Sequence, residues 1–343
     1  MTKNVLTRLF RTAVIVGGVM AAAAITLYSA FYGRAVGSDT TIYIGKADSY
    51  EEVVEQLRPA LCGGVYRRAF DYYAKRLKLA ERLHAGRYCF DEDESVIRVV
   101  RRLVLGEQSP VHLVVGSVRT LPQLAGKLAA QIEADSATLL HVMRNKELRR
   151  ELGLQRDSTI AIFIPTTYQV WWNISPEEFM CRMRREYDNF WNEERTAKLK
   201  RCRLTKYEVM TLASIVYEET KRVADMPRIA GVYINRLRRG MPLQACPTVK
   251  YAMGRFELRR ILHEHLRYRS PFNTYINRGL PPAPICVPSI AAIDGVLNYE
   301  QSSYLFFCAS PALDGSHCFA RTLKEHNANS KRYSAELNRR NIK

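Results

Sequence analysis

The chain has 343 residues, of which 47% are hydrophobic and only 14 are proline. This length and composition exclude a disordered polypeptide and allow two domains with a substantial core. There are 52 lysines and arginines against 34 aspartates and glutamates, which gives a formal net charge of +18. Such an excess often indicates nucleic-acid binding, but the basic residues are spread along the chain without a groove-reading motif.

An apolar segment without charged residues occupies residues 13–32. Roughly 20 residues at ~1.5 Å each are enough to cross a ~30 Å hydrocarbon core, so we predict a single transmembrane helix there. Basic residues precede the segment, which places residues 1–12 in the cytoplasm and exports the rest. The alternative is a cleaved signal peptide, whose apolar region is usually ~7–15 residues long and ends at small residues, whereas Phe31 and Tyr32 stand here.

Export also affects the interpretation of the positive net charge, because an exported domain rarely meets nucleic acid. We therefore expect no nucleic-acid partner. Attraction to an anionic cell-wall polymer or to a membrane surface fits this topology, and a solvated basic surface without a ligand is the alternative.

Residues 40–90 have the order strand, helix, helix, strand. The expected strands are Thr40–Ile44 and Arg87–Phe90, and the expected helices cover residues 49–57 and Ala69–Leu79. The pattern Ser49-x-x-Glu52 is a capping box that begins the first helix. This order resembles a LysM-like glycan-binding module, which we place at residues 39–108. A spacer that only lifts the next domain off the membrane is the alternative.

The rest of the chain alternates helices with short strands. The expected helices are Ser95–Leu103, Pro122–Ile132, Glu177–Trp191 and one that begins at the capping box Thr322-x-x-Glu325, and the expected strands are Val111–Val115 and Ile160–Ile164. Because the regular βα repetition of a parallel sheet is missing, we assign the fold class α+β, with a mixed α+β domain over residues 109–343.

A helix expected over Lys206–Val223 has a carboxylate on its apolar face. This face contains Leu212, Val216, Glu219 and Val223, whose spacing of i, i+4, i+7 and i+11 places them on one side of a helix. Glu219 should therefore point inward, and its neighbour Glu218 outward.

A carboxylate on an apolar face loses solvation, so the pKa of Glu219 should rise. A glutamic acid that keeps its proton near neutral pH can act as a general acid. The alternative is a structural role, in which Glu219 lies at the edge of the core and pairs with Arg222.

Several later segments combine turn-forming residues with side chains that hydrogen-bond sugar hydroxyls and acetamido groups. They include residues 235–251, 270–284 and 315–317, and Tyr168 follows an earlier apolar run. Each segment alone is an ordinary polar loop.

Together, and behind a membrane anchor, these segments resemble the YceG-like endolytic murein transglycosylases, the MltG family. The family motif around the catalytic acid matches Ala213-Ser-Ile-Val216, two variable residues and then Glu219-Thr220, so the resemblance assigns the catalytic acid to Glu219. The expected substrate-binding residues are Tyr168, Asn235, Gln244, Thr248, Tyr251, Asn273, Thr274, Tyr275 and His317. Cys246 and Thr166 stand where members often carry aspartate.

The resemblance implies cleavage of the bond between N-acetylmuramic acid and N-acetylglucosamine without water, inside nascent glycan strands. Glu219 would protonate the leaving oxygen and then accept the proton of the muramic acid C6 hydroxyl, which leaves a 1,6-anhydro end. The expected partners are peptidoglycan glycan strands, the membrane and peptidoglycan polymerases, and the expected role is to end strand elongation. We expect no cofactor, and a location in the bacterial inner membrane with the catalytic domain in the periplasm.

Two other functions remain open from the residues alone. A hydrolytic muramidase would need a second carboxylate such as Asp225 or Asp294, because adjacent helical residues such as Glu218 and Glu219 diverge by about 100°. A non-catalytic peptidoglycan-binding scaffold of the cell-wall synthesis machinery would need no acid at all.

The chain contains eight cysteines, without a C-x-x-C arrangement or the spacing of a zinc site, so we predict no metal. Cys308 and Cys318 lie on two apolar runs joined by a turn with Asp314-Gly315. A cross-strand disulfide and buried free thiols are both compatible with this pattern.

Overall fold

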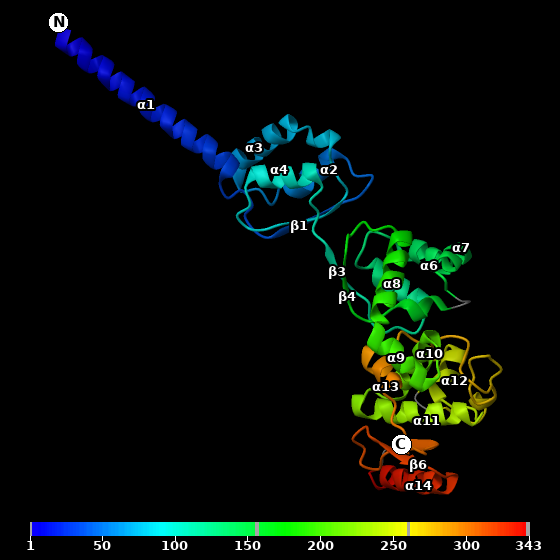
Figure 1. The fold of residues 1–343 in the computed structure, drawn as a ribbon. Helices are drawn as coiled ribbons and strands as arrows, with labels where there is room; N and C mark the ends of the chain where they lie inside the picture. Colours follow the sequence, from blue (N-terminus) through cyan, green and yellow to red (C-terminus); the bar gives the residue numbers. More distant parts are fainter. Residues whose placement is uncertain (1, 155–157, 259–260, 341–343) are drawn as a thin grey trace. The chain divides into compact units, whose positions relative to one another are not determined.

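The computed structural model describes residues 2–154, 158–258 and 261–340 (Figure 1). The chain forms two units. The first unit contains Met1–His112 with the short segments Gln131–Glu133 and Gln169–Ile174, and the second contains the remaining residues. Both helices and short antiparallel strands are present, as the predicted α+β class requires.

A long helix, α1 (Thr2–Tyr32), begins the first unit. Its segment Thr7–Tyr32 is long and apolar enough to cross a membrane, in agreement with the predicted span, although the helix begins well before residue 13. Ala30 near its end is buried, and the ring of Phe31 meets those of Tyr72 and Tyr73 edge-on. The end of the apolar helix is therefore anchored in the core of this unit, while the predicted orientation in a membrane stays a prediction.

The predicted order strand, helix, helix, strand is confirmed in the first unit. Strand β1 (Thr40–Ile44) pairs antiparallel with β2 (Gly86–Phe90), and α2 (Tyr50–Leu57) begins at the capping box of Ser49. Helix α3 (Gly63–Arg76) begins six residues before the predicted Ala69, because two glycines at its start give no helical signal. Helix α4 (Val96–Leu105) completes the core. Glycan binding by this module stays a prediction.

The strand predicted at Ile160–Ile164 is wrong. These residues belong mainly to a 3₁₀ turn, Ser158–Ile162, that packs against helices on two sides, and the strand β4 (Thr167–Val170) forms later. All five predicted strand residues are buried. The continuous apolar run therefore indicates burial rather than strand structure. Strand β4 pairs with β3 (Val111–Val114) in a second two-stranded sheet.

Helices make up most of the second unit. The first five are α5 (Leu121–Ala129), α6 (Ser136–Arg144), α7 (Lys146–Glu151), α8 (Pro176–Phe190) and α9 (Glu193–Cys202). They are followed by α10 (Lys206–Glu219), α11 (Met226–Arg238), α12 (Cys246–Met253) and α13 (Ile290–Leu297). Helices α10, α11 and α13 pack on one another and form the core. Gly231 on α11 permits the close approach of the segment after α13, because a Cβ there would collide with the carbonyl oxygen of Glu300.

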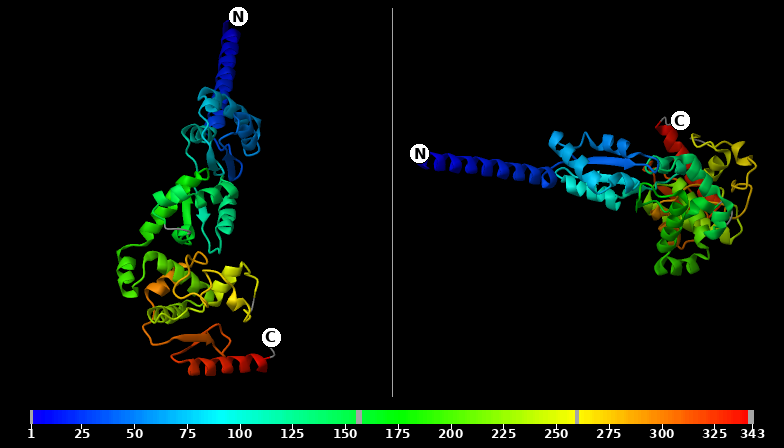
Figure 2. Two further views of the ribbon diagram at one scale, coloured as in Figure 1. Left: turned by 90° about the vertical axis from the view of Figure 1, so that its right-hand side faces the viewer. Right: turned by 90° about the horizontal axis from the view of Figure 1, so that it is seen from above.

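A hairpin and a helix end the second unit. Strands β5 (Phe306–Ala309) and β6 (His317–Ala320) pair antiparallel, and α14 (Leu323–Arg339) packs against both (Figure 2). The register places Cys308 directly opposite Cys318, and both are free thiols in this structure.

Candidate active site

Helix α10 carries Glu219 at its last position. A capping box of Thr205 and Glu208 begins the helix, and every residue of Val209–Val216 is buried. The predicted end at Val223 is wrong, because Thr220 has an extended backbone and accepts a hydrogen bond from the Arg222 amide through its side chain. Val223 is consequently 60% exposed. The predicted apolar face of the helix is therefore present up to Glu219, where the helix ends.

The surrounding protein desolvates the carboxyl group of Glu219, although part of the residue still reaches the surface. Burial raises the pKa of Glu219 from its ordinary value of 4.5 to about 7. A hydrogen bond from the Tyr233 hydroxyl and the charge of Lys250 oppose this rise, and the charge of Glu218 adds to it. Near neutral pH, Glu219 therefore exists in both protonation states.

Tyr233 on α11 positions this carboxyl group. Its hydroxyl donates to Oε1 of Glu219 over 2.8 Å, and its ring is buried edge-on against Phe307 of β5. The ring of Phe307 also contacts that of His317, whose Nδ1 lies 2.8 Å from Oδ2 of Asp225. The C-terminal hairpin thus supports the tyrosine that orients Glu219.

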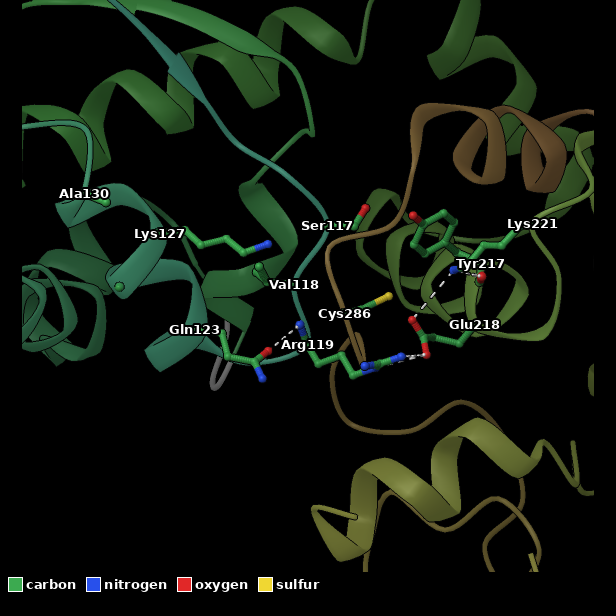
Figure 3. Close-up of a pocket in the computed structure, with 11 residues that line it drawn as sticks. Ser117, Val118, Arg119, Gln123, Lys127, Ala130, Tyr217, Glu218, Lys221 and Cys286 are labelled. Atoms are coloured by element: carbon green, nitrogen blue, oxygen red, sulfur yellow. Dashed lines mark hydrogen bonds and ion pairs between the residues drawn. The ribbon is translucent and has the colours of Figure 1, made fainter. Parts of the chain in front are cut away.

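Glu218 points away from this environment, as predicted. Nε and Nη2 of Arg119 donate to its Oε2 over 3.1 and 2.8 Å, and Nζ of Lys221 lies 3.9 Å from its Oε1 (Figure 3). Arg222, the partner expected for a purely structural Glu219, instead pairs with Asp314 at 3.3 Å. Glu219 accepts a hydrogen bond from a neutral tyrosine, Tyr233, which suits a group that must change protonation state.

Three of the expected substrate-binding residues are buried and bonded within the protein. Oγ1 of Thr248 donates to the carbonyl of Ala245 and lies 2.9 Å from Oγ1 of Thr274. Nδ2 of Asn273 donates to two backbone carbonyls of the preceding loop, over 3.0 and 2.8 Å. These side chains fix the loop of residues 270–277 against α12, so in this conformation they shape the site instead of facing a ligand.

Four more expected residues reach the surface, three of them in or next to the segments around α12. Oη of Tyr275 lies 3.2 Å from Sγ of Cys246, and burial raises the pKa of that thiol. Tyr251 packs on Phe272 with ring centroids 4.8 Å apart. Gln244 is exposed, with its backbone in the left-handed region at φ 54°. The fourth residue, His317, is partly exposed on β6.

The polar groups of the last two expected residues are bonded within the protein. Nδ2 of Asn235 donates to the carbonyls of Ser302 and Tyr304, and the hydroxyl of the buried Tyr168 donates to the carbonyl of Ile164. Both bonds stabilise backbone segments. The assignment of all nine residues to substrate binding stays a prediction.

The sequence did not predict the side chains that interact with the two carboxylates. These are Tyr233 and Lys250 for Glu219, and Arg119 for Glu218. Tyr233 lies fourteen positions after Glu219 on another helix, and Arg119 lies 99 positions before Glu218. No local spacing rule connects residues so far apart. The preference of a buried carboxylate for a hydrogen-bond donor was the only available signal, and it does not identify the donor.

Residues 42–332 match the YceG-like family. A Bacillus subtilis protein named endolytic murein transglycosylase is 27% identical over 286 residues, which cover 79% of this chain and 78% of that protein. A Streptococcus pneumoniae protein of the same name is 36% identical over 135 residues, 38% of this chain and 24% of its own length. The crystal structure of a YceG-like protein from Listeria monocytogenes superposes with a TM-score of 0.58 at 26% identity, covering 85% of this chain and 98% of that one. Because the family match spans most of the sequence, the chain belongs to the YceG-like family.

Proposed function

We propose that the chain is a lytic transglycosylase that cleaves the bond between N-acetylmuramic acid and N-acetylglucosamine within nascent murein strands. Membership of the YceG-like family and the names of two relatives support the reaction class. The observation that carries the proposal is the environment of Glu219, where burial raises the pKa to about 7 and Tyr233 donates a hydrogen bond.

In the first step, protonated Glu219 donates its proton to the glycosidic oxygen as that bond breaks and positive charge develops at C1 of the muramic acid. The carboxylate left behind keeps the hydrogen bond from Tyr233, which stabilises its charge. This bond makes proton loss possible in spite of burial.

In the second step, the carboxylate of Glu219 accepts the proton of the C6 hydroxyl as that oxygen bonds to C1. Glu219 regains its proton, and the product carries a 1,6-anhydro ring without the addition of water. The nucleophile belongs to the substrate, so one carboxylate suffices. The two carboxylates considered for a hydrolase have other partners, since Asp225 bonds His317 and Asp294 pairs with Arg195.

The cellular setting belongs to the same proposal. The apolar segment Thr7–Tyr32 anchors the chain in the inner membrane by a single pass, with the N-terminus in the cytoplasm and both folded units in the periplasm. The LysM-like module contacts glycan, and cleavage near the peptidoglycan polymerases ends strand elongation.

Digestion of purified peptidoglycan by the full-length protein in detergent, followed by mass spectrometry, tests the reaction. A transglycosylase releases fragments with 1,6-anhydro-muramic acid ends, which are lighter by one water than the hydrolytic products. Reducing muramic acid ends would show a muramidase. Binding to sacculi without any fragment release would favour the scaffold function.

A further inference from the structure

Arg236 on α11 is a buried cation whose partners are not carboxylates. The residue is only 7% exposed, and among the residues that the structure describes no aspartate or glutamate pairs with it. Its Nε donates to the carbonyl of Leu305 over 2.7 Å. Its Nη1 donates to the carbonyl of Leu243 over 2.9 Å and to Oε1 of Gln244 over 3.2 Å. The guanidinium therefore ties the segment that contains Gln244 to the segment before β5.

The same bonds hold Gln244 in an unusual conformation. Its backbone lies in the left-handed region at φ 54°, which residues other than glycine rarely adopt. The residue is exposed, although Leu243 and Ala245 on either side of it are buried. Its backbone amide donates to the carbonyl of Thr274 over 3.0 Å. A strained backbone persists only where its surroundings determine it, and here the bonds to Arg236 and Thr274 do so.

The chemistry of arginine also fixes the orientation of the Gln244 carboxamide. A guanidinium has only hydrogen-bond donors, so the atom that faces Arg236 must be the carboxamide oxygen. The NH2 group of Gln244 has two donors, and within the described part of the chain no acceptor bonds them. This exposed side chain therefore offers donors to an acceptor such as a carbonyl oxygen.

Helix α11 places this carboxamide on the same side as Glu219. Tyr233, which donates to Glu219, and Arg236, which donates to Gln244, are three positions apart. Residues at this spacing lie on one face of a helix, ~4.5 Å apart along its axis. Both side chains also contact the segment of residues 305–307. One face of α11 thus positions the proposed catalytic acid and the donor group.

The chemistry of murein identifies the acceptor. Every sugar of a murein strand carries an acetamido group, whose carbonyl oxygen only accepts hydrogen bonds. We propose that Arg236 is a positioning residue, which orients Gln244 so that its NH2 group donates to the acetamido carbonyl of a sugar beside the cleaved bond. This inference rests on the proposed function. The strain at Gln244 then serves to aim its side chain at the strand.

Gln244→Glu tests the direction of this bond. The carboxylate keeps the shape of the side chain and still accepts from Arg236, but it has no NH2 group. The full-length protein in detergent is titrated with the tetramer of N-acetylglucosamine and with the fully deacetylated tetramer, at a slightly acid pH where the amino groups are charged. The variant should bind the acetylated tetramer about fivefold to tenfold more weakly than the parent does. It should bind the deacetylated tetramer more tightly than the parent does, because a carboxylate accepts from an ammonium group.

Arg236→Lys tests the positioning role. Lysine keeps the charge but loses the fork that reaches both the loop carbonyl and Gln244. This variant should weaken binding of the acetylated tetramer by a similar factor, and it should add little to the loss in the Gln244→Glu background, because the two residues act through one bond. The matched control is Gln301→Glu, the same change at an exposed position after α13, which should bind both tetramers as the parent does.

Melting temperatures establish that the variants fold, and Gln244→Glu should melt no lower than the parent, because its carboxylate pairs with Arg236. If Arg236→Lys does not fold, the two tetramers and Gln244→Glu decide alone. Unchanged affinity of folded Gln244→Glu for the acetylated tetramer would overturn the inference, as would a parent that does not bind this tetramer. Additive losses from the two substitutions would overturn the positioning role. Anhydro-ended fragments from the parent are measured separately, so the proposed function can stand where this inference fails.

Discussion

The two sides of the C-terminal end of α10 hold adjacent glutamates in opposite environments. On one side, Glu218 lines a cavity between α5 and α10 and accepts two hydrogen bonds from Arg119. On the other, Glu219 is partly buried beside Tyr233, and desolvation raises its pKa to about 7. The direction in which a side chain leaves the helix thus decides whether a glutamate is desolvated next to a neutral donor or pairs with a cation.

The largest expected effect comes from replacing each glutamate in turn. Glu219→Gln keeps the shape and the bond from Tyr233 but removes the exchangeable proton, so release of anhydro-ended fragments should fall by about 10²–10⁴-fold or more. Glu218→Gln removes only the charge that pairs with Arg119, so this variant should retain most activity. Product mass spectrometry with single-turnover rates measures both.

Circular dichroism and melting temperature serve as controls for folding in both variants. Substantial turnover by the folded Glu219→Gln variant would contradict the assignment of the acid. Equal losses in the two variants would remove the contrast between the two sides of α10.

The pH dependence of the parent is the next effect in size. Because the first step needs protonated Glu219, kcat/KM should fall as pH rises through about 7, and by about tenfold per pH unit above it. A soluble strand fragment assayed between pH 5 and 9 gives this profile. A flat profile over that range, or an alkaline fall beginning near the ordinary pKa of 4.5, would refute the raised pKa.

Tyr233→Phe tests how the hydrogen bond from Tyr233 affects the pKa and the activity of Glu219. The phenylalanine keeps the packing on Phe307 but removes the donor to Glu219. Loss of a hydrogen bond to a charged group costs about 1.5–3 kcal/mol, so kcat should fall by about 10-fold or more. Because this bond lowers the pKa of Glu219, the alkaline limb of the pH profile should move to higher pH. A lower kcat without that movement would indicate a structural role for the hydroxyl.

Local patterns were sufficient to predict much of the fold. Capping-box patterns placed the starts of α2 and α14, and β-branched residues placed β1. The apolar run Ile160–Ile164 was misread as a strand, because burial on two sides gives helical turns and strands the same composition. The helix that was predicted to reach Val223 ends at Glu219, because the chain turns at Thr220. This turn depends on a single hydrogen bond, from the Arg222 amide to the side chain of Thr220, which spacing along the sequence does not predict.

The site was predictable only where one helix face determines it. Helical spacing identified Glu219 over Glu218, and the structure places them on the expected sides. The partners Tyr233 and Arg119 come from distant segments, whose meeting is decided by the packing of α10 on α11 and by the path of the chain before α5. Polar loop residues such as Asn273 could not be assigned to binding or to internal bonds, because both uses favour the same residue types.

The smallest expected effect is on stability, and it has opposite signs on the two sides of α10. Because the pKa of Glu219 is raised from 4.5 to about 7 in the folded protein, ionisation of the folded form costs stability, from nothing below about pH 4.5 to its full extent above about pH 7. Glu219→Gln should therefore gain stability over the parent as pH rises from 5 to 8, by about 1–3 kcal/mol.

Glu218→Gln should lose up to about 1 kcal/mol at both pH values, because it breaks a partly exposed ion pair with Arg119. Urea unfolding of the parent and the two variants at pH 5 and pH 8 measures these differences. A gain for Glu219→Gln that is equal at the two pH values would arise from packing rather than from ionisation. If Glu218→Gln instead gained stability as pH rises, Glu218 would be the desolvated carboxylate. The roles assigned to the two glutamates would then have to be exchanged.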